Sequence, residues 1–114
     1  MSISRGEIYV AALDPVIGRE ISKTRPVVVV SNDLNNQFAA TVTVLPITSM
    51  NLDRIYPFEV FLPKGSGGLP KDSKAKADQI RTLDKARLAK LVGKVDQKQI
   101  TAIDKAIRIH LGME

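Results

Sequence analysis

The side chains of this sequence that could take part in chemistry are cations and hydroxyls near the ends of predicted strands: Arg25, Thr48, Ser49, Arg81 and Thr82. A guanidinium can bind a phosphate through two parallel hydrogen bonds and stabilise charge that develops on it. A hydroxyl can hold a second phosphate oxygen by hydrogen bonding. Each residue also has a structural interpretation, since Thr48 could simply end its strand and Arg81 could pair with an aspartate.

The sequence lacks most of the residue sets that other kinds of catalysis need. It has no cysteine, which excludes disulfides, thiolate chemistry and cysteine-based zinc sites. The sequence has one histidine, His110, so catalysis by a pair of histidines is excluded. We expect His110 on the surface. The acidic residues show no metal-binding spacing, and we expect neither a metal nor a cofactor.

Arg25 directly precedes the strongest strand signal in the chain. Four consecutive valines, residues 27–30, predict a short strand that is buried on both faces. Pro26 favours an extended conformation of Arg25. We therefore expect Arg25 at the mouth of a rigid core strand, close to solvent, where it could hold an anion or merely solubilise the strand end.

The remaining elements predict a mainly β fold. Residues 32–36 read as a turn, residues 83–88 as one helical turn, and five further segments as strands: 8–13, 41–48, 58–62, 73–80 and 91–95. These strands, with short connections and a helix at the end of the chain, indicate a small antiparallel barrel or sheet. A length of 114 residues suits one domain, 1–114.

The helix has the clearest signals. Asp96 is a favoured N-cap, and Gln99 three residues later can complete a capping box. Gly112 ends the helix. One apolar stripe follows the helical period: Ile100, Ile103, Ile107 and Leu111.

The net charge of +5 is concentrated in one segment. Residues 64–94 contain nine lysines and arginines against three aspartates. Such a surplus can attract a polyanion such as nucleic acid, although it can equally be a solvated basic face. No segment is apolar enough to span a bilayer, and the polar N-terminus carries no export signal, so we expect a cytoplasmic protein without a membrane partner.

Five blocks of the sequence, in order and together spanning nearly the whole chain, resemble the MazF/PemK family of type II toxin–antitoxin systems: residues 5–9, 13–20, 25–29, 45–48 and 79–88. The resemblance implies an SH3-like, CcdB/PemK-like barrel with a C-terminal helix, arranged as a homodimer. It implies a metal-independent endoribonuclease that cuts single-stranded RNA, usually mRNA, leaving 2′,3′-cyclic phosphate and 5′-OH ends. A cognate MazE-like antitoxin with a disordered acidic tail would neutralise it.

The resemblance also assigns roles to residues. Arg25 corresponds to the family's catalytic arginine, which acts in proton transfer and stabilises the phosphorane, and Thr48 to the catalytic threonine, which hydrogen-bonds the scissile phosphate. Five further positions correspond to places where family members contact RNA: Glu20, Ser49, Tyr56, Asp78 and Gln79. Four positions are interpreted as mainly structural: Arg81, Thr82, Asp84 and Arg87. Residues 22–24 depart from the family, which often has glycines before the arginine.

Two other functions fit the same fold. Toxins similar to CcdB poison DNA gyrase through protein contacts, and a small barrel could bind RNA without cutting it. The presence of Arg25 together with Thr48 favours the enzyme, because the gyrase poisons do not rely on that pair. The exposed Ile17 and Ile21 of the first long loop would suit a protein partner, or would plug the end of a barrel.

Overall fold

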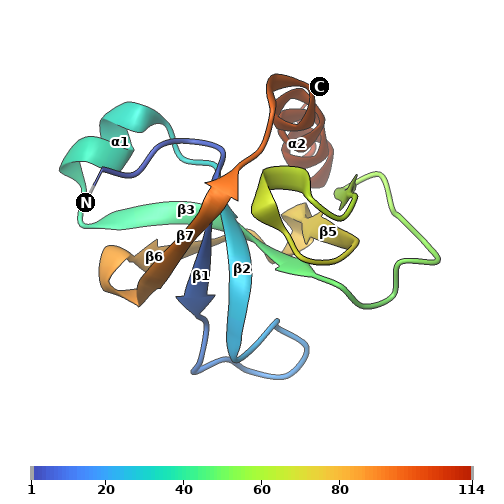
Figure 1. The fold of residues 1–114 in the computed structure, drawn as a ribbon, viewed down its shortest axis with the longest axis horizontal. Helices are drawn as coiled ribbons and strands as arrows, with labels where there is room; N and C mark the ends of the chain where they lie inside the picture. Colours follow the sequence, from blue (N-terminus) through green and yellow to red (C-terminus); the bar gives the residue numbers. More distant parts are fainter. Residues whose placement is uncertain (1, 114) are drawn as a thin grey trace.

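Strand β3, Thr41–Thr48, is the strand around which the other elements assemble, because it forms hydrogen bonds along both of its edges. The computed structural model describes residues 2–113. Six more strands, two α-helices and three 3₁₀ turns accompany β3 (Figure 1): β1 Glu7–Ala12, β2 Thr24–Val29, α1 Asp33–Phe38, β4 Glu59–Leu62, Ser66–Gly68, β5 Ser73–Lys76, Ala77–Gln79, β6 Arg81–Asp84, Lys85–Arg87, β7 Leu88–Lys94 and α2 Gln97–His110.

All seven strands belong to one antiparallel sheet. The strand order is β4-β5-β3-β2-β1-β7, and β6 pairs with the first half of β3 on the same edge as β5. The order ends at β4 and at β7, and these two strands do not pair with each other within residues 2–113. The mainly β prediction is confirmed, whereas the predicted barrel is a curved, open sheet.

The predicted strand at residues 73–80 is interrupted. Strand β5 ends at Lys76, and a 3₁₀ turn at Ala77–Gln79 separates it from β6. The turn is closed by the Ile80 N–H, which donates to the Ala77 carbonyl at 3.2 Å. Because the two short strands lie one after the other along a single edge of β3, this turn lets the sheet bend.

The valine strand is buried on both faces, as predicted. Val28 packs with Ile8 in a first core cluster, which lies on the side of α2. Val27 and Val29 point to the opposite face and pack with Tyr9 in a second core cluster. These three valines are fully buried, whereas Val30, predicted as part of the same strand, lies beyond the end of β2 and is half-buried. The strand that begins at Arg25 is therefore fixed by apolar packing on both sides.

Helix α2 has the predicted capping box, in which Asp96 accepts from the Gln99 N–H and the Gln99 side chain accepts from the Asp96 N–H. Leu111, predicted as the last member of the apolar stripe, is 53% exposed. It is the C-cap residue, and its position beyond the last helical turn takes it off the buried face. His110 is exposed, as expected.

Three other local predictions need correction. The turn predicted at residues 32–36 is the start of helix α1, whose N-cap Asn32 accepts from the Asn35 N–H. The helical turn predicted at residues 83–88 is the end of β6 followed by a 3₁₀ turn, and β7 begins earlier than predicted. Within residues 2–113, no helix combines the length and the apolar character that crossing a membrane requires.

Strand β7 packs tightly against the 3₁₀ turn Ser66–Gly68, in the loop between β4 and β5. A Cβ atom on Gly93 would lie 2.3 Å from the Gly67 carbonyl oxygen, in the 3₁₀ turn Ser66–Gly68. We therefore expect Gly93→Ala to lower the free energy of unfolding by about 3 kcal/mol, because backbone must move to make room. Ala89→Val, at an exposed position of β7, should change it by less than about 0.5 kcal/mol. Equal melting curves for the two variants in urea would contradict this packing.

Candidate active site

The pairing of β2 with β3 places Arg25 beside Thr48. Val27 lies opposite Pro46 and Val28 opposite Leu45. Continuing this antiparallel register by two residues sets Arg25 opposite Thr48, and directly opposed side chains lie on the same face of a sheet. Arg25 is exposed and Thr48 half-buried, so the strand-mouth position predicted for the cation is confirmed.

Arg25 and Thr48 line one hollow of about 190 Å³, which we call the Arg25 hollow. Strands β2, β3 and β5 and the loop after the 3₁₀ turn Ser66–Gly68 form its walls. Its lining consists of nine residues: Arg25, Pro26, Ile47, Thr48, Ser49, Leu69, Pro70, Lys71 and Ser73. No Asp, Glu or His is among these residues, so the charges known to face the hollow are positive.

Lys71 brings a second cation to the Arg25 hollow that the sequence did not identify as a site residue. It lies in a loop rich in glycine and proline, and only its place in the basic segment 64–94 marked it in the sequence. The neighbouring Ser73 hydroxyl donates to the Lys71 carbonyl at 3.0 Å, which fixes the backbone there. Two cations and the Thr48 hydroxyl in one small hollow suit an anion such as a phosphate.

The Thr48 hydroxyl is oriented by the chain that follows it. Thr48 Oγ1 accepts a hydrogen bond from the Met50 N–H at 3.1 Å. Since one lone pair of the oxygen is used in this way, the hydroxyl proton is left to donate elsewhere. Ser49, the adjacent residue, is exposed at the edge of the hollow.

Residues 49–58 connect β3 to β4 and loop outward at the right of Figure 1; we call them the 49–58 connection. Under it lies a neighbouring hollow of about 440 Å³ that Tyr56 lines. Tyr56 is 43% exposed, and its ring stacks on Phe58 with ring centroids 5.4 Å apart. Tyr56 is therefore not a buried core aromatic, and it sits on a rigid aromatic partner.

Two predicted RNA contacts meet at the loop between β1 and β2. Glu20 accepts from the Ile17 N–H at 3.1 Å, and the Gln79 side chain accepts from the Ile21 N–H at 3.3 Å. Asp78 lies 3.7 Å from the Lys76 ammonium. None of these three predicted contacts lines the Arg25 hollow. The structure thus brings Arg25, Thr48 and Ser49 together, and the other predicted contacts lie outside this hollow.

The base of the same loop is held by two arginines. Arg81 donates to the Leu13 carbonyl at 3.2 Å, and Arg87 donates to the Ala12 carbonyl at 3.1 Å. Their structural interpretation is confirmed. At the tip of the loop, Ile17 is 83% exposed, whereas Ile21 packs against the second core cluster. Ile17 is therefore available to a partner, whereas Ile21 closes the end of the second core cluster.

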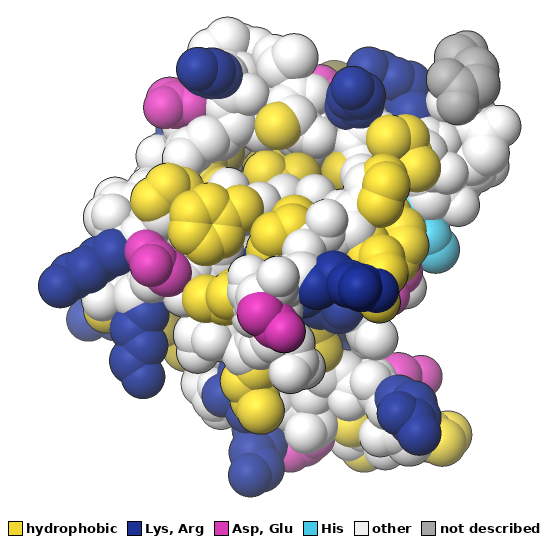
Figure 2. Space-filling model, turned by 90° about the vertical axis from the view of Figure 1, so that its right-hand side faces the viewer, with side chains coloured by type: hydrophobic (Ala, Val, Ile, Leu, Met, Phe, Trp, Pro, Cys, Tyr) yellow, Lys and Arg dark blue, Asp and Glu magenta, His cyan; other side chains and the backbone are white. Residues whose placement is uncertain are grey.

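The surface around the 49–58 connection is mixed in character. Figure 2 shows this side of the molecule, with basic, acidic and apolar side chains interspersed. One cation of the basic segment, Lys74, is buried and paired with Glu59. The surface is consequently less basic than the count of charges in the segment 64–94 indicates.

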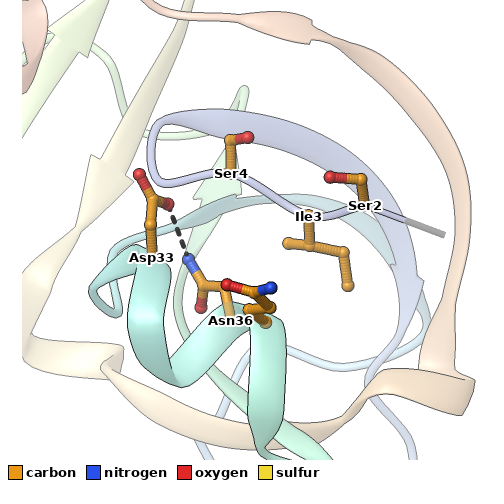
Figure 3. Close-up of a pocket in the computed structure, with 6 residues that line it drawn as sticks. Ser2, Ile3, Ser4, Asp33 and Asn36 are labelled. Atoms are coloured by element: carbon orange, nitrogen blue, oxygen red, sulfur yellow. Dashed lines mark hydrogen bonds between the residues drawn. The ribbon is translucent and has the colours of Figure 1, made fainter.

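Another hollow, of about 610 Å³, lies between the N-terminal segment and α1 (Figure 3). Asp33 accepts there from the Arg5 N–H at 2.6 Å and from the Asn36 amide at 3.3 Å. The Arg5 hydrogen bond is the main cause that holds the pKa of Asp33 below its ordinary value. Among residues 2–113, no Lys or Arg lines this hollow and no predicted site residue does. Its polar groups tie the N-terminus to α1, so we place the candidate site at the Arg25 hollow.

Comparison with known proteins decides the family. The model of the PemK-like, MazF-like toxins of type II toxin–antitoxin systems matches residues 4–111. The chain belongs to this family. The MazF-like chain is 41% identical to the endoribonuclease MazF9 of Mycobacterium tuberculosis, over 96% of both proteins. It is 35% identical to the endoribonuclease EndoA of Bacillus subtilis, over 99% of this chain and 97% of EndoA.

A solved structure agrees with this assignment. The structure of a mycobacterial endoribonuclease in complex with its cognate antitoxin superposes on this MazF-like chain with a TM-score of 0.81. The two sequences are 26% identical, and the match covers 98% of this chain and 97% of that one. These likenesses favour a toxin of the endoribonuclease type and give no support to the gyrase-poison alternative.

Acid should destabilise the structure through Glu59. Burial raises the pKa of this carboxyl group, but hydrogen bonds from Lys76, the Tyr56 N–H and Lys74 outweigh it and leave the pKa below the ordinary value of 4.5. Because the folded state has the lower pKa, this stabilisation is present above about pH 4.5 and is lost as the pH falls through the folded pKa. We therefore expect the free energy of unfolding to decrease as the pH is lowered below about 4.5.

The pH dependence can be assigned by substitution. Glu59→Gln should flatten part of the decline in urea unfolding between about pH 3 and pH 6. Glu20→Gln makes the same change at an exposed position and should leave the decline as it is. Identical pH profiles for the wild type and Glu59→Gln would show that the buried Glu59 carboxylate does not cause the loss of stability in acid.

Proposed function

We propose that the chain is the toxin of a type II toxin–antitoxin system and a metal-independent endoribonuclease that cuts single-stranded RNA, mRNA in particular, at the Arg25 hollow. The observation that carries the proposal is the cross-strand placement of Arg25 and Thr48 on one hollow, in a chain of the MazF-like family whose relatives are named endoribonucleases.

The proposed reaction is an internal transfer of the phosphoryl group. The ribose 2′-oxygen attacks the adjacent phosphorus, and the bond from phosphorus to the 5′-oxygen breaks. The 2′-hydroxyl proton leaves, and the 5′-oxygen gains a proton. The products are a 2′,3′-cyclic phosphate and a 5′-OH, and the step needs no metal to balance.

The two site residues have distinct parts in this step. A guanidinium stays protonated in proteins, so the charge of Arg25 stabilises the phosphorane, which bears more negative charge than the starting phosphate. Thr48, whose oxygen already accepts from the Met50 N–H, donates a hydrogen bond to a non-bridging phosphate oxygen. Loss of one such donor typically lowers the rate by about 10²–10³-fold. The residues that line the hollow include no carboxylate and no imidazole that could take the 2′-proton.

RNA sequence would be read around the hollow rather than in it. Ser49 lies at its edge, and the exposed part of Tyr56 can stack on a base. Asp78 and Gln79 would contact base edges, as the resemblance implies, and Glu20 lies in the loop that the Gln79 side chain also touches. Single-stranded RNA suits such a surface because its bases are free to be splayed apart.

The partners follow from the same family. A cognate, MazE-like antitoxin would cover the site, as supported by the related mycobacterial endoribonuclease that is solved with its antitoxin. The exposed Ile17 offers an apolar contact in a loop that also carries the exposed cations Arg19 and Lys23, which suit an acidic tail. Residues 1–114 would act as one toxin domain, supported by the match over residues 4–111. An mRNA substrate places this activity in the cytoplasm.

Cleavage of RNA in EDTA tests the reaction. The purified protein should cut a long single-stranded RNA at discrete sites and leave 5′-OH and cyclic-phosphate ends. Arg25→Ala and Thr48→Ala should each lower the single-turnover rate by about 10²-fold or more, because each removes one group that stabilises the phosphorane. The folded state should persist, since Arg25 is exposed and Thr48 lies at the end of its strand.

The matched control is Arg108→Ala, which removes an exposed guanidinium from α2 and should leave the rate within about threefold of the wild type. Intact RNA across several sequences would contradict the proposed function. Full activity in Arg25→Ala would contradict the placement of the site.

We also propose that the toxin is a homodimer, as the resemblance implies. Multi-angle light scattering at micromolar concentration should give twice the mass of the 12.5 kDa chain. A mass equal to one chain at this concentration would contradict the proposal.

A further inference from the structure

We propose that Lys74, a residue outside the Arg25 hollow, is the positioning residue that holds the 49–58 connection and thereby orients the Thr48 hydroxyl. This inference rests on the proposed function, because it concerns the same catalytic step. Without this inference, Lys74 would simply be counted with the other basic residues as part of an RNA-binding surface.

All three hydrogen-bond donors of the Lys74 ammonium are used inside the protein. Lys74 is 3% exposed, in strand β5. Its Nζ donates to the Asn51 carbonyl at 2.9 Å, to the Arg54 carbonyl at 3.1 Å and to Glu59 Oε1 at 3.0 Å. An ammonium has three N–H donors, so none remains for RNA.

Glu59 completes the attachment of the same segment. Its Oε1 also accepts from the Tyr56 N–H at 3.0 Å, and its Oε2 accepts from Lys76 at 2.7 Å. Lys74 and Glu59 thus satisfy three backbone groups of the 49–58 connection, those of Asn51, Arg54 and Tyr56. The connection contains no helix or strand of its own, so these side-chain contacts replace the backbone ladder that would otherwise fix it.

The attachment leads directly to Thr48. Lys74 lies opposite Thr48 in the pairing of β3 with β5. Asn51, whose carbonyl Lys74 holds, has a left-handed backbone with φ of 56°, a conformation that Asn tolerates better than most residues. The residue before it, Met50, supplies the N–H that Thr48 Oγ1 accepts. Holding the Asn51 carbonyl therefore restrains the backbone next to the Met50 N–H, whose hydrogen bond orients the Thr48 hydroxyl.

A buried ion pair by itself adds little to the free energy of unfolding. Apolar residues of similar size often replace such a pair without loss, because removing two charges from water offsets most of their attraction. Two of the three contacts made by Lys74 go to carbonyls of an irregular connection rather than to a charge. This arrangement is suited to holding a backbone in place, and the nearer of the two carbonyls held here, that of Asn51, lies three residues after Thr48.

The test compares three variants of one ion cluster. Lys74→Met removes the contacts to the Asn51 and Arg54 carbonyls. Glu59→Gln and Lys76→Met weaken the same cluster but leave those two contacts in place. Each variant is assayed for single-turnover cleavage of RNA in EDTA, for KM, for thermal unfolding, and for hydrogen exchange of the Met50 amide by NMR.

We expect Lys74→Met to lower kcat about 10-fold or more with KM within about threefold, because it disturbs the orientation of Thr48 rather than RNA binding. Exchange of the Met50 amide should become about tenfold faster, because its hydrogen bond to Thr48 opens more often. Lys76→Met removes a contact to Glu59 but none to the 49–58 connection, so it should keep kcat and Met50 exchange within about threefold of the wild type even where its melting temperature falls. Glu59→Gln removes the charge that faces Lys74 and should lie between Lys74→Met and Lys76→Met. If Lys74→Met does not fold, Lys74→Gln, whose amide still donates but lacks the charge and the reach, takes its place.

The outcomes separate this inference from the proposed function. If the wild type cuts RNA and folded Lys74→Met keeps the wild-type kcat, the positioning role is overturned and the endoribonuclease stands. If all three variants lose kcat in proportion to their loss of stability, Lys74 is only a structural residue. If the wild type cuts no RNA, the proposed function fails and this inference fails with it.

Discussion

The constraint on which this structure depends is that strand β3 forms hydrogen bonds along both edges and ends at Thr48. On one edge the β2 register brings Arg25 level with Thr48, and on the other the β5 register brings Lys74 level with it. The three residues form a row across three strands. Their side chains differ in what they meet: Arg25 meets solvent, Thr48 lines the hollow, and Lys74 is covered by the 49–58 connection.

Apolar packing makes this row rigid. The valines that follow Arg25 are enclosed by a core cluster on each face of the sheet. A one-residue slip of β2 would send every one of them to the wrong cluster, and it would also separate Arg25 from Thr48. The same burial that stabilises the fold therefore sets the alignment of the site, and no contact between the two residues is needed to keep them together.

The sequence predicted the parts of this account that depend on local pattern. The unbroken valines indicated a strand buried on both faces, and Asp96 with Gln99 indicated where α2 begins; the structure confirms both. The break after Lys76 could not be predicted, because it depends on β5 and β6 sharing one edge of β3. The open sheet could not be predicted either, since closure depends on whether strands far apart in the chain pair.

The candidate site shows the same division. Arg25 was placed correctly from its neighbours, whereas the resemblance was needed to single out Thr48 from the other hydroxyls. Lys71 and Lys74 are three residues apart and look equivalent in the sequence, yet one lines the Arg25 hollow and the other is 3% exposed beneath a connection. Burial of a lysine beside a glutamate fifteen residues away in sequence leaves no local signal.

The central claim is that the scissile phosphate of RNA lies between Arg25 and Thr48. The most direct test is a crystal structure of the protein with an RNA of its preferred sequence that carries a 2′-fluoro group at the scissile ribose, which removes the attacking hydroxyl. The account predicts that the scissile phosphate accepts hydrogen bonds of about 3 Å from the Arg25 guanidinium and the Thr48 hydroxyl. A scissile phosphate bound elsewhere, with neither residue in contact with it, would contradict the account.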